Sequence, residues 1–426
     1  MPYSLDQYSA RSISPAAYLD FVEQKVKRIF YNQLPESVEY DALQGIESHL
    51  LAFYYQDELI EVAKISLLPY LRIYRRAQLN WLADLDGLEE HLPGILRALE
   101  NFLLEQQNCL VLTICPMSIK TLHGAKKEDL AKFDAAKSER IHTKFIKSEY
   151  EHIDYDFYSN TAVQPKFIFV KKLSGMTEEQ AFADLDSKVR SHMRVCERFN
   201  IQIRELRENE AEVFNQIMLA MAENYGFDKL RLTLVSPEEL RLARSGQSKK
   251  YYAIYLNIAE SLAFNEKMQR EIEAEIAANP AESRREKQAV HNLKQQAEAN
   301  QKRRQEILEL EENYPQEEEL ILGVSEFTFS KSDFICLQTA VREEFVRLSP
   351  AYRAHSLMLA EAIRQGADYY NFFAVSDPQS PEGDEGVLRF KEQFNGYTEE
   401  YTGTYLKTLR DPLPARILKA AKNLFR

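Results

Sequence analysis

A long stretch without glycine constrains the fold of this chain more than any other feature. From Asn257 to Tyr314 the sequence has no glycine and no strand pattern, and it is rich in Glu, Lys, Arg, Gln and Ala. Apolar residues recur at helical spacing on both sides of Asn279-Pro280. Because proline cannot continue a helix, the pattern predicts two long helices that turn there. We expect an antiparallel coiled-coil arm that projects from the body.

The second predicted helix of this arm carries an uneven charge. Between residues 284 and 304, seven basic residues stand against Glu286 and Glu298. The seven are Arg284, Arg285, Lys287, Lys294, Lys302, Arg303 and Arg304. A basic stripe on a projecting arm suits the phosphate backbone of RNA, so these residues are candidate tRNA contacts. A spacer or a dimerisation device with solvated charges is the alternative.

The other segments alternate predicted helices and strands, as in an α/β or α+β protein. In the first unit a helix begins at Ser14, and strands cover 49–55, 59–68 and 109–114. A second α/β unit starts at Gln164-Pro165 with a strand over 166–173. Next we expect one helix from Thr177 to about Phe199. The chain of 426 residues is long enough for two such units. The predicted division is a first domain (1–162), a second domain in two parts (163–256 and 315–405), the arm between them (257–314), and a C-terminal segment (406–426).

The C-terminal segment reads as a basic amphipathic helix. Leu413, Ile417, Ala421 and Leu424 repeat at helical spacing. Its candidate membrane-surface residues are Arg416, Lys419, Lys422 and Arg426. Such a helix suits peripheral contact with an anionic membrane. Packing on the body of the protein is the alternative.

Composition excludes several classes of protein. The net charge of −12 means that RNA binding requires a local basic surface. The four cysteines form no C-x-x-C pair and the eight histidines show no ligand spacing, so we expect no metal site and reduced thiols. We find neither a signal-peptide pattern nor an apolar run long enough to span a bilayer. We therefore expect a cytoplasmic protein, with the inner face of the plasma membrane as its peripheral contact.

The segment from Gly386 to Tyr405 carries the most chemical information. Lys391 stands between Phe390 and Phe394. A lysine beside aromatic rings is partly desolvated, and this strengthens its interaction with a developing oxyanion. A lysine that reaches to solvent from an amphipathic strand or turn is the alternative.

This segment resembles the C-terminal signature of the Fem family of non-ribosomal peptidyltransferases, and the likeness is greatest to the MurM and MurN branch. The matching residues are Gly386, Arg389, Phe390, Lys391, Phe394, Glu400, Tyr401 and Gly403. Asn395-Gly396 replaces an immediate glycine. Further matches occur in order along the chain at Leu79–Asp86, Gln164-Pro165-Lys166, the basic helix with Lys188, Arg190, Arg194 and Arg198, Tyr225–Arg231, and Tyr369–Ser376.

The resemblance implies two GNAT-like (acyl-CoA N-acyltransferase-like) domains with a helical arm. It implies transfer of an amino acid from aminoacyl-tRNA to the stem-peptide lysine of a lipid-linked or nucleotide-linked muropeptide precursor. No cofactor is implied beyond the aminoacyl-tRNA. Lys391, backed by Phe390, matches the position that stabilises the tetrahedral intermediate. Arg231, which matches an arginine on the precursor's phosphates, and Arg389 are the candidate substrate-binding residues.

Three other functions remain open. An acetyl-CoA-dependent N-acetyltransferase needs a pyrophosphate-binding R/Q-x-x-G-x-G/A turn, and none occurs among the 13 glycines. A tRNA-dependent transferase that acts on another amine acceptor differs only in its substrate. A non-enzymatic membrane scaffold would use the arm and the basic tail alone.

Overall fold

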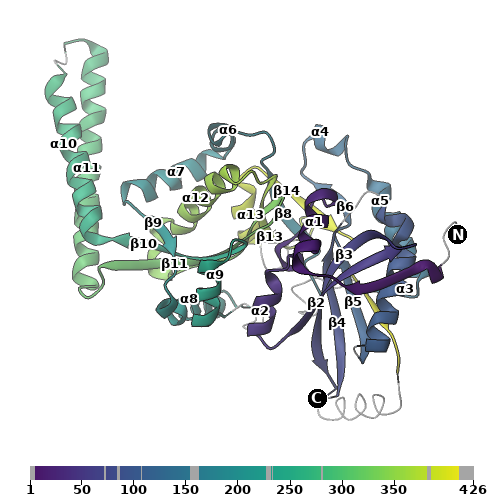
Figure 1. Ribbon diagram of the computed structural model, residues 1–426. Coiled ribbons are helices and arrows are strands. Elements are labelled where there is room, and N and C mark those ends of the chain that lie inside the picture. The colour runs from purple at the N-terminus through teal and green to yellow at the C-terminus, as the bar shows by residue number, and fades with distance from the viewer. Residues whose placement is uncertain are drawn as a thin grey trace.

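The computed structural model describes residues 5–71, 73–83, 87–106, 108–153, 163–226, 232, 234–279, 282–380 and 385–411. Figure 1 shows a body with two lobes, each built around one mixed sheet, and a helical hairpin that projects from one lobe. Leu79 to Ala83 of the segment 79–86 is described, whereas Arg231 and all residues after Asp411 lie outside the described part.

The first sheet has seven strands. Their order is β1 (Tyr8–Ser12), β2 (Glu47–Tyr55), β3 (Glu58–Tyr70), β4 (Tyr74–Leu82), β5 (Cys109–Pro116), β15 (Thr404–Thr408) and β7 (Glu151–Ile153). Its helices are α1 (Pro15–Lys25), α2 (Ser37–Leu43), α3 (Leu88–Gln106) and α5 (Ala135–Lys147). Only β4 and β5 run parallel, and β5 is buried along its whole length because neighbours cover it on all sides.

The second sheet has eight strands. Their order is β6 (Ile119–His123), β14 (Tyr397–Tyr401), β8 (Phe167–Lys172), β13 (Tyr369–Ala374), β12 (Asp333–Val341), β11 (Glu319–Phe329), β10 (Lys249–Asn257) and β9 (Gln202–Glu205). Its helices are α6 (Glu178–Ala183), α7 (Ser187–Arg198), α8 (Ala211–Tyr225), α9 (Pro237–Ser245), α12 (Pro350–Arg364) and α13 (Glu385–Glu392). The parallel pair here is β12 and β13. The short helix α4 (Lys127–Leu130) follows β6, and its Asp129 forms an ion pair with Lys172 of β8 in this sheet.

The lobes exchange strands, so strand pairing crosses the predicted domain boundaries. Strand β6, from the first part of the chain, pairs with β14 of the second sheet. Strand β15, from the end of the chain, pairs with β5 and β7 of the first sheet. The prediction of a helix from residue 406 is therefore wrong for Leu406–Thr408, which are part of β15. Lys407 is also not a surface charge, because its Nζ lies 3.0 Å from Glu100 Oε1.

The predicted helix from Thr177 to Phe199 is two helices. Thr177 caps α6, and Gln180 returns the hydrogen bond to complete a capping box. Asp186 then caps α7, where its carboxylate accepts a hydrogen bond from the N–H of Lys188. Because Asp186 is an N-cap, the chain begins a new helix at Ser187 instead of extending α6.

The projecting hairpin consists of α10 (Ile258–Ala278) and α11 (Arg284–Asn313). Two buried asparagines join the helices: Asn265 Nδ2 donates to Asn300 Oδ1 at 2.8 Å, and Asn300 Nδ2 donates to the Asn265 carbonyl at 3.0 Å. A buried asparagine pair specifies the register of a coiled coil. Within the described residues, no helix is long and apolar enough to cross a membrane.

Candidate functional site

Lys391 is fixed by two backbone carbonyls of β13. It lies in α13, and its Nζ donates to the carbonyl oxygens of Phe372 at 2.8 Å and Ala374 at 2.6 Å. The side chain is half-buried. The structure therefore directs Lys391 toward the end of a strand of the second sheet, where its ammonium group is held in one place.

The two carbonyls face this ammonium because β13 is irregular between them. Phe373 has a φ of 61°, and the pairing of β13 with β8 shifts register between Asn371 and Ala374. A left-handed conformation is costly for a residue with a side chain. It is stabilised here by Asn371, whose Oδ1 accepts a hydrogen bond from the Phe373 N–H at 2.8 Å.

Asn371 in turn belongs to a buried ionic cluster between the lobes. Its Nδ2 donates to Asp333 Oδ1 at 3.2 Å. Arg28, which follows α1 of the first lobe, lies 2.7 Å from Asp333 Oδ1 and 2.8 Å from Glu399 Oε1. Both carboxylates are almost fully buried. Burial disfavours the charged guanidinium, but the pKa of Arg28 is raised overall by Asp333 and Glu399, so the ion pairs prevail.

Aromatic rings pack around Phe390, the residue before Lys391. The ring of Phe390 packs edge-on against Tyr352 at a centroid distance of 4.9 Å and lies 5.4 Å from the imidazole of His355. His355 Nδ1 is hydrogen-bonded to the Tyr370 hydroxyl at 2.9 Å. Burial, and then the charge of Lys391, lower the pKa of His355 to about 3. This imidazole is therefore neutral at physiological pH and adds no positive charge to the site.

This arrangement is suited to stabilising a developing negative charge. A cation that is already held by two carbonyls needs little reorganisation when an oxyanion forms beside it. Neutral His355 and the carbonyl oxygens give no nucleophile of the Ser-His-Asp kind. The chemistry that fits is electrostatic assistance to attack on a carbonyl carbon.

Arg389 does not join Lys391. It is exposed, and its Nη2 lies 2.5 Å from Glu385 Oε1, one turn earlier in α13. Residues two apart on a helix do not share a face. Arg389 therefore points away from the carbonyls that hold Lys391, and its substrate-binding role stays a prediction.

The basic residues of the arm differ in their surroundings. Arg303 packs on the ring of Phe199 and donates to Asn300 Oδ1, and Arg304 lies 3.5 Å from Glu266. The remaining five are exposed and have no ion-pair partner within the described part of the chain: Arg284, Arg285, Lys287, Lys294 and Lys302.

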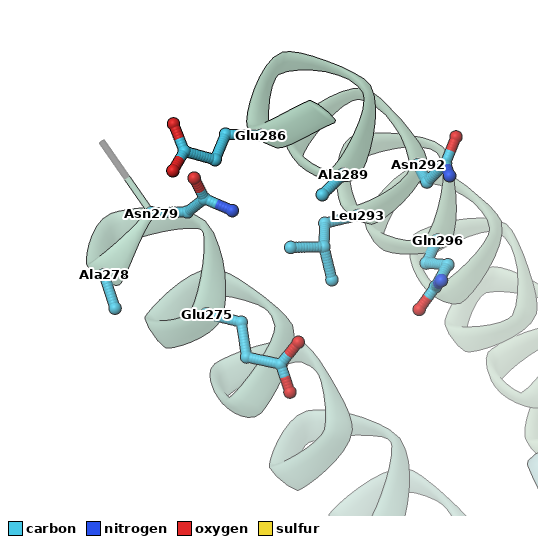
Figure 2. A pocket seen from close by; sticks show the side chains of 8 residues that line it. All are labelled: Glu275, Ala278, Asn279, Glu286, Ala289, Asn292, Leu293 and Gln296. Atoms are coloured by element: carbon cyan, nitrogen blue, oxygen red, sulfur yellow. The ribbon is translucent and has the colours of Figure 1, made fainter. Parts of the chain in front are cut away.

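A groove opens between the two helices at the tip of the hairpin. Figure 2 shows Leu293 pointing into this gap, with Glu275 across from it and Glu286 near the turn. The lining is polar apart from Leu293 and two alanines, and it carries two carboxylates. The groove is far from α13 (Figure 1) and has no residue suited to acyl transfer. We therefore place the candidate active site at Lys391.

Comparison with known proteins identifies the chain. The FemAB family model matches residues 13–233 and 246–422. The chain belongs to the FemAB family. It is 20% identical over 413 residues to the aminoacyltransferase FemA of Staphylococcus epidermidis, covering 94% of this chain and 96% of that protein. It is 22% identical over 406 residues to FemA of Staphylococcus aureus, covering 90% and 92%.

A solved structure agrees with this assignment to the FemAB family. The crystal structure of FemX superposes with a TM-score of 0.74 at 17% identity, covering 96% of this chain and 100% of that one. The predicted fold class is confirmed as a mixed α/β fold with two sheets and a helical arm, whereas the GNAT-like character of the two domains stays a prediction. The predicted enzyme class, acyltransferase, is also confirmed.

Four residues around the site were not found from the sequence as functional residues: Arg28, Asp333, His355 and Asn371. Asn371 lies within the matched segment Tyr369–Ser376, and that was the one available signal for its importance. Arg28 lies more than 300 positions before its partner Asp333. No spacing rule connects residues so far apart.

Proposed function

We propose that this FemAB protein transfers an amino acid from aminoacyl-tRNA to the stem-peptide lysine of a peptidoglycan precursor. Membership of the family and the name of its FemA relatives support aminoacyl transfer. The observation that carries the proposal is the position of Lys391, whose ammonium is held by the Phe372 and Ala374 carbonyls. The MurM and MurN branch stays a prediction, and the proposed acceptor is a lipid-linked or nucleotide-linked precursor.

The reaction is the aminolysis of an ester. The neutral amine of the acceptor lysine attacks the ester carbonyl carbon, a C–N bond forms, and the C–O bond to the terminal ribose breaks. The amine loses a proton and the ribose oxygen gains one, so no cofactor is required. Lys391 stabilises the tetrahedral oxyanion between these steps, and a donor of this kind typically contributes about 3 kcal/mol. Phe390 limits access of water to one side of the lysine.

The other predicted contacts belong to the same proposal. The basic residues of the arm bind the tRNA backbone at a distance from the reaction: Arg284, Arg285, Lys287, Lys294, Lys302, Arg303 and Arg304. Arg231 and Arg389 bind the precursor. The basic tail with Arg416, Lys419, Lys422 and Arg426 brings the enzyme to the inner face of the plasma membrane, in the cytoplasm.

The identity of the acyl donor distinguishes this proposal from its main alternative, an acetyl-CoA-dependent N-acetyltransferase. Purified enzyme and a lysine-containing muropeptide precursor are incubated with total tRNA charged with radiolabelled amino acids, or with radiolabelled acetyl-CoA. We expect label in the muropeptide from charged tRNA alone. Label from acetyl-CoA alone would show an N-acetyltransferase instead, and label from neither donor would favour the scaffold.

A further inference from the structure

Helix α7 presents one line of polar and cationic residues to solvent. The line consists of Ser187, Ser191, Arg194 and Arg198. These residues are four, three and four positions apart, which places them on one face of an α-helix. All four are exposed, whereas Val189 and Cys196 on the other side are buried.

The two arginines of this line are not neutralised. Neither Arg194 nor Arg198 has an ion-pair partner among the residues that the structure describes. Arg190, outside the line, donates instead to the carbonyls of Ala183 and Leu185. Glu197 also lies off the line, with its Oε1 3.9 Å from Arg353. In a chain with a net charge of −12, this is a local positive surface.

The first half of α7 and its cap lie beside the candidate active site. The imidazole of His192 stacks on Tyr352 at 4.2 Å, and Tyr352 contacts Phe390, the neighbour of Lys391. The N–H of Asp186, the cap of α7, donates to the Gln393 carbonyl at 3.0 Å. The start of the line therefore lies beside the end of α13.

The last turn of α7 leads to the arm. Phe199, which ends the helix, lies under the guanidinium of Arg303 at 5.7 Å. Burial, and then the nearby charge of Arg198, lower the pKa of Arg303. Figure 1 shows α7 running from α6 toward the base of the hairpin. Lys302, exposed beside Arg303, extends the positive surface onto α11.

We propose that the exposed face of α7, together with Lys302 and Arg303, binds the phosphate backbone of the donor tRNA between the arm and Lys391. The inference rests on the proposed function for the identity of the donor. A helix of 12 residues extends about 18 Å, enough for several backbone contacts in a row. Paired serine and arginine side chains are suited to phosphate oxygens. An anionic bilayer fits less well, because α7 exposes no large apolar side chain to insert.

The test compares the double variant R194A/R198A with wild type and with R194K/R198K. The probe is total charged tRNA, titrated between 50 and 200 mM salt. Each phosphate contact contributes about 0.7 to 0.9 to the slope of log K against log salt. We expect R194A/R198A to bind at least about tenfold more weakly, with a slope shallower by about 1 to 2, and the lysine variant to recover most of the affinity. The matched control R11A/R97A removes two exposed arginines of the first lobe and should bind as wild type does.

Transfer kinetics complete the test. The loss in R194A/R198A should appear in the KM for charged tRNA, while kcat changes little. An unchanged affinity and an unchanged salt slope in a folded R194A/R198A protein would overturn the inference. Weaker binding to anionic vesicles without weaker binding to tRNA would also overturn it, in favour of a lipid surface. If the wild-type enzyme binds tRNA through α7 but transfers nothing to the muropeptide, the proposed function fails and the RNA surface stands.

Discussion

The side-chain oxygen of Asn371 accepts a hydrogen bond from the backbone N–H of Phe373 at 2.8 Å, and Phe373 has a φ of 61°. This pair connects the ionic cluster between the lobes with the carbonyls that hold Lys391. The position of the candidate catalytic lysine therefore depends on a strained residue in the neighbouring strand and on contacts from the other lobe.

The strain at Phe373 can be tested with two variants that both remove the ring. F373N should tolerate the left-handed conformation, whereas the β-branched side chain of F373V should not. We expect F373V to be less stable than F373N by about 1–2 kcal/mol in denaturant unfolding. Its kcat should also fall further, because Lys391 loses its fixed carbonyls. Equal stability and equal kcat would show that the backbone conformation of Phe373 has no part in holding the site.

Replacement of Arg28 should destabilise the protein strongly. R28M leaves Asp333 and Glu399 buried without their cation. The loss of one partner from a buried ion cluster costs about 3–5 kcal/mol. The difference in the free energy of unfolding between R28M and wild type, measured in urea, gives this cost. The exposed pair between Arg11 and Asp57 provides the control, since R11M should change stability by less than about 1 kcal/mol. A loss in R28M as small as that in R11M would contradict the assigned role of the cluster.

His355 should make stability depend on pH. Its folded pKa of about 3 lies below the ordinary value near 6.5, so the unfolded chain binds a proton that the folded chain does not. The contribution of neutral His355 to the free energy of unfolding is complete above pH 6.5 and is lost as the pH falls toward 3. Between pH 7 and pH 5 the loss amounts to about 2 kcal/mol. We expect H355F, which cannot be protonated, to lose about that much less stability over this interval. Parallel pH profiles for both proteins would exclude this role.

The two buried asparagines of the arm should be coupled. N300L leaves Asn265 buried without its partner, which costs about 1–3 kcal/mol. The double variant N265L/N300L should recover much of that stability while losing the specification of register. Thermal unfolding of the single and double variants gives the coupling energy. Additive effects would show that the two side chains do not interact.

Local signals in the sequence predicted many elements correctly. Ser14 and Thr177 cap helices, and the arm follows from a region without glycine in which apolar residues keep helical spacing. The choice of Lys391 as the candidate catalytic residue came from the ordered motif that ends in Phe390-Lys391, and its role stays a prediction. These signals act over a few residues, so they can be read from the sequence directly.

Contacts between distant segments could not be predicted in this way. Nothing near Thr404 shows that β15 inserts between β5 and β7 of the first sheet, because pairing depends on which edge is open in the folded protein. A left-handed Phe373 gives no signal either, since phenylalanine rarely adopts that conformation. The β-prone run Tyr251–Leu256 is compatible with a strand, but its place between β9 and β11 is a property of the whole sheet.

The role of Lys391 is tested most directly by the transfer rate of K391M under saturating charged tRNA and muropeptide. Methionine keeps much of the length of lysine but has no charge. We expect kcat to fall about 100-fold or more, as for the loss of one oxyanion donor, while the protein stays folded. K331M removes an exposed lysine that also donates to a carbonyl, that of Glu23, and should transfer at the wild-type rate. A folded K391M enzyme with wild-type kcat would show that Lys391 does not stabilise the oxyanion.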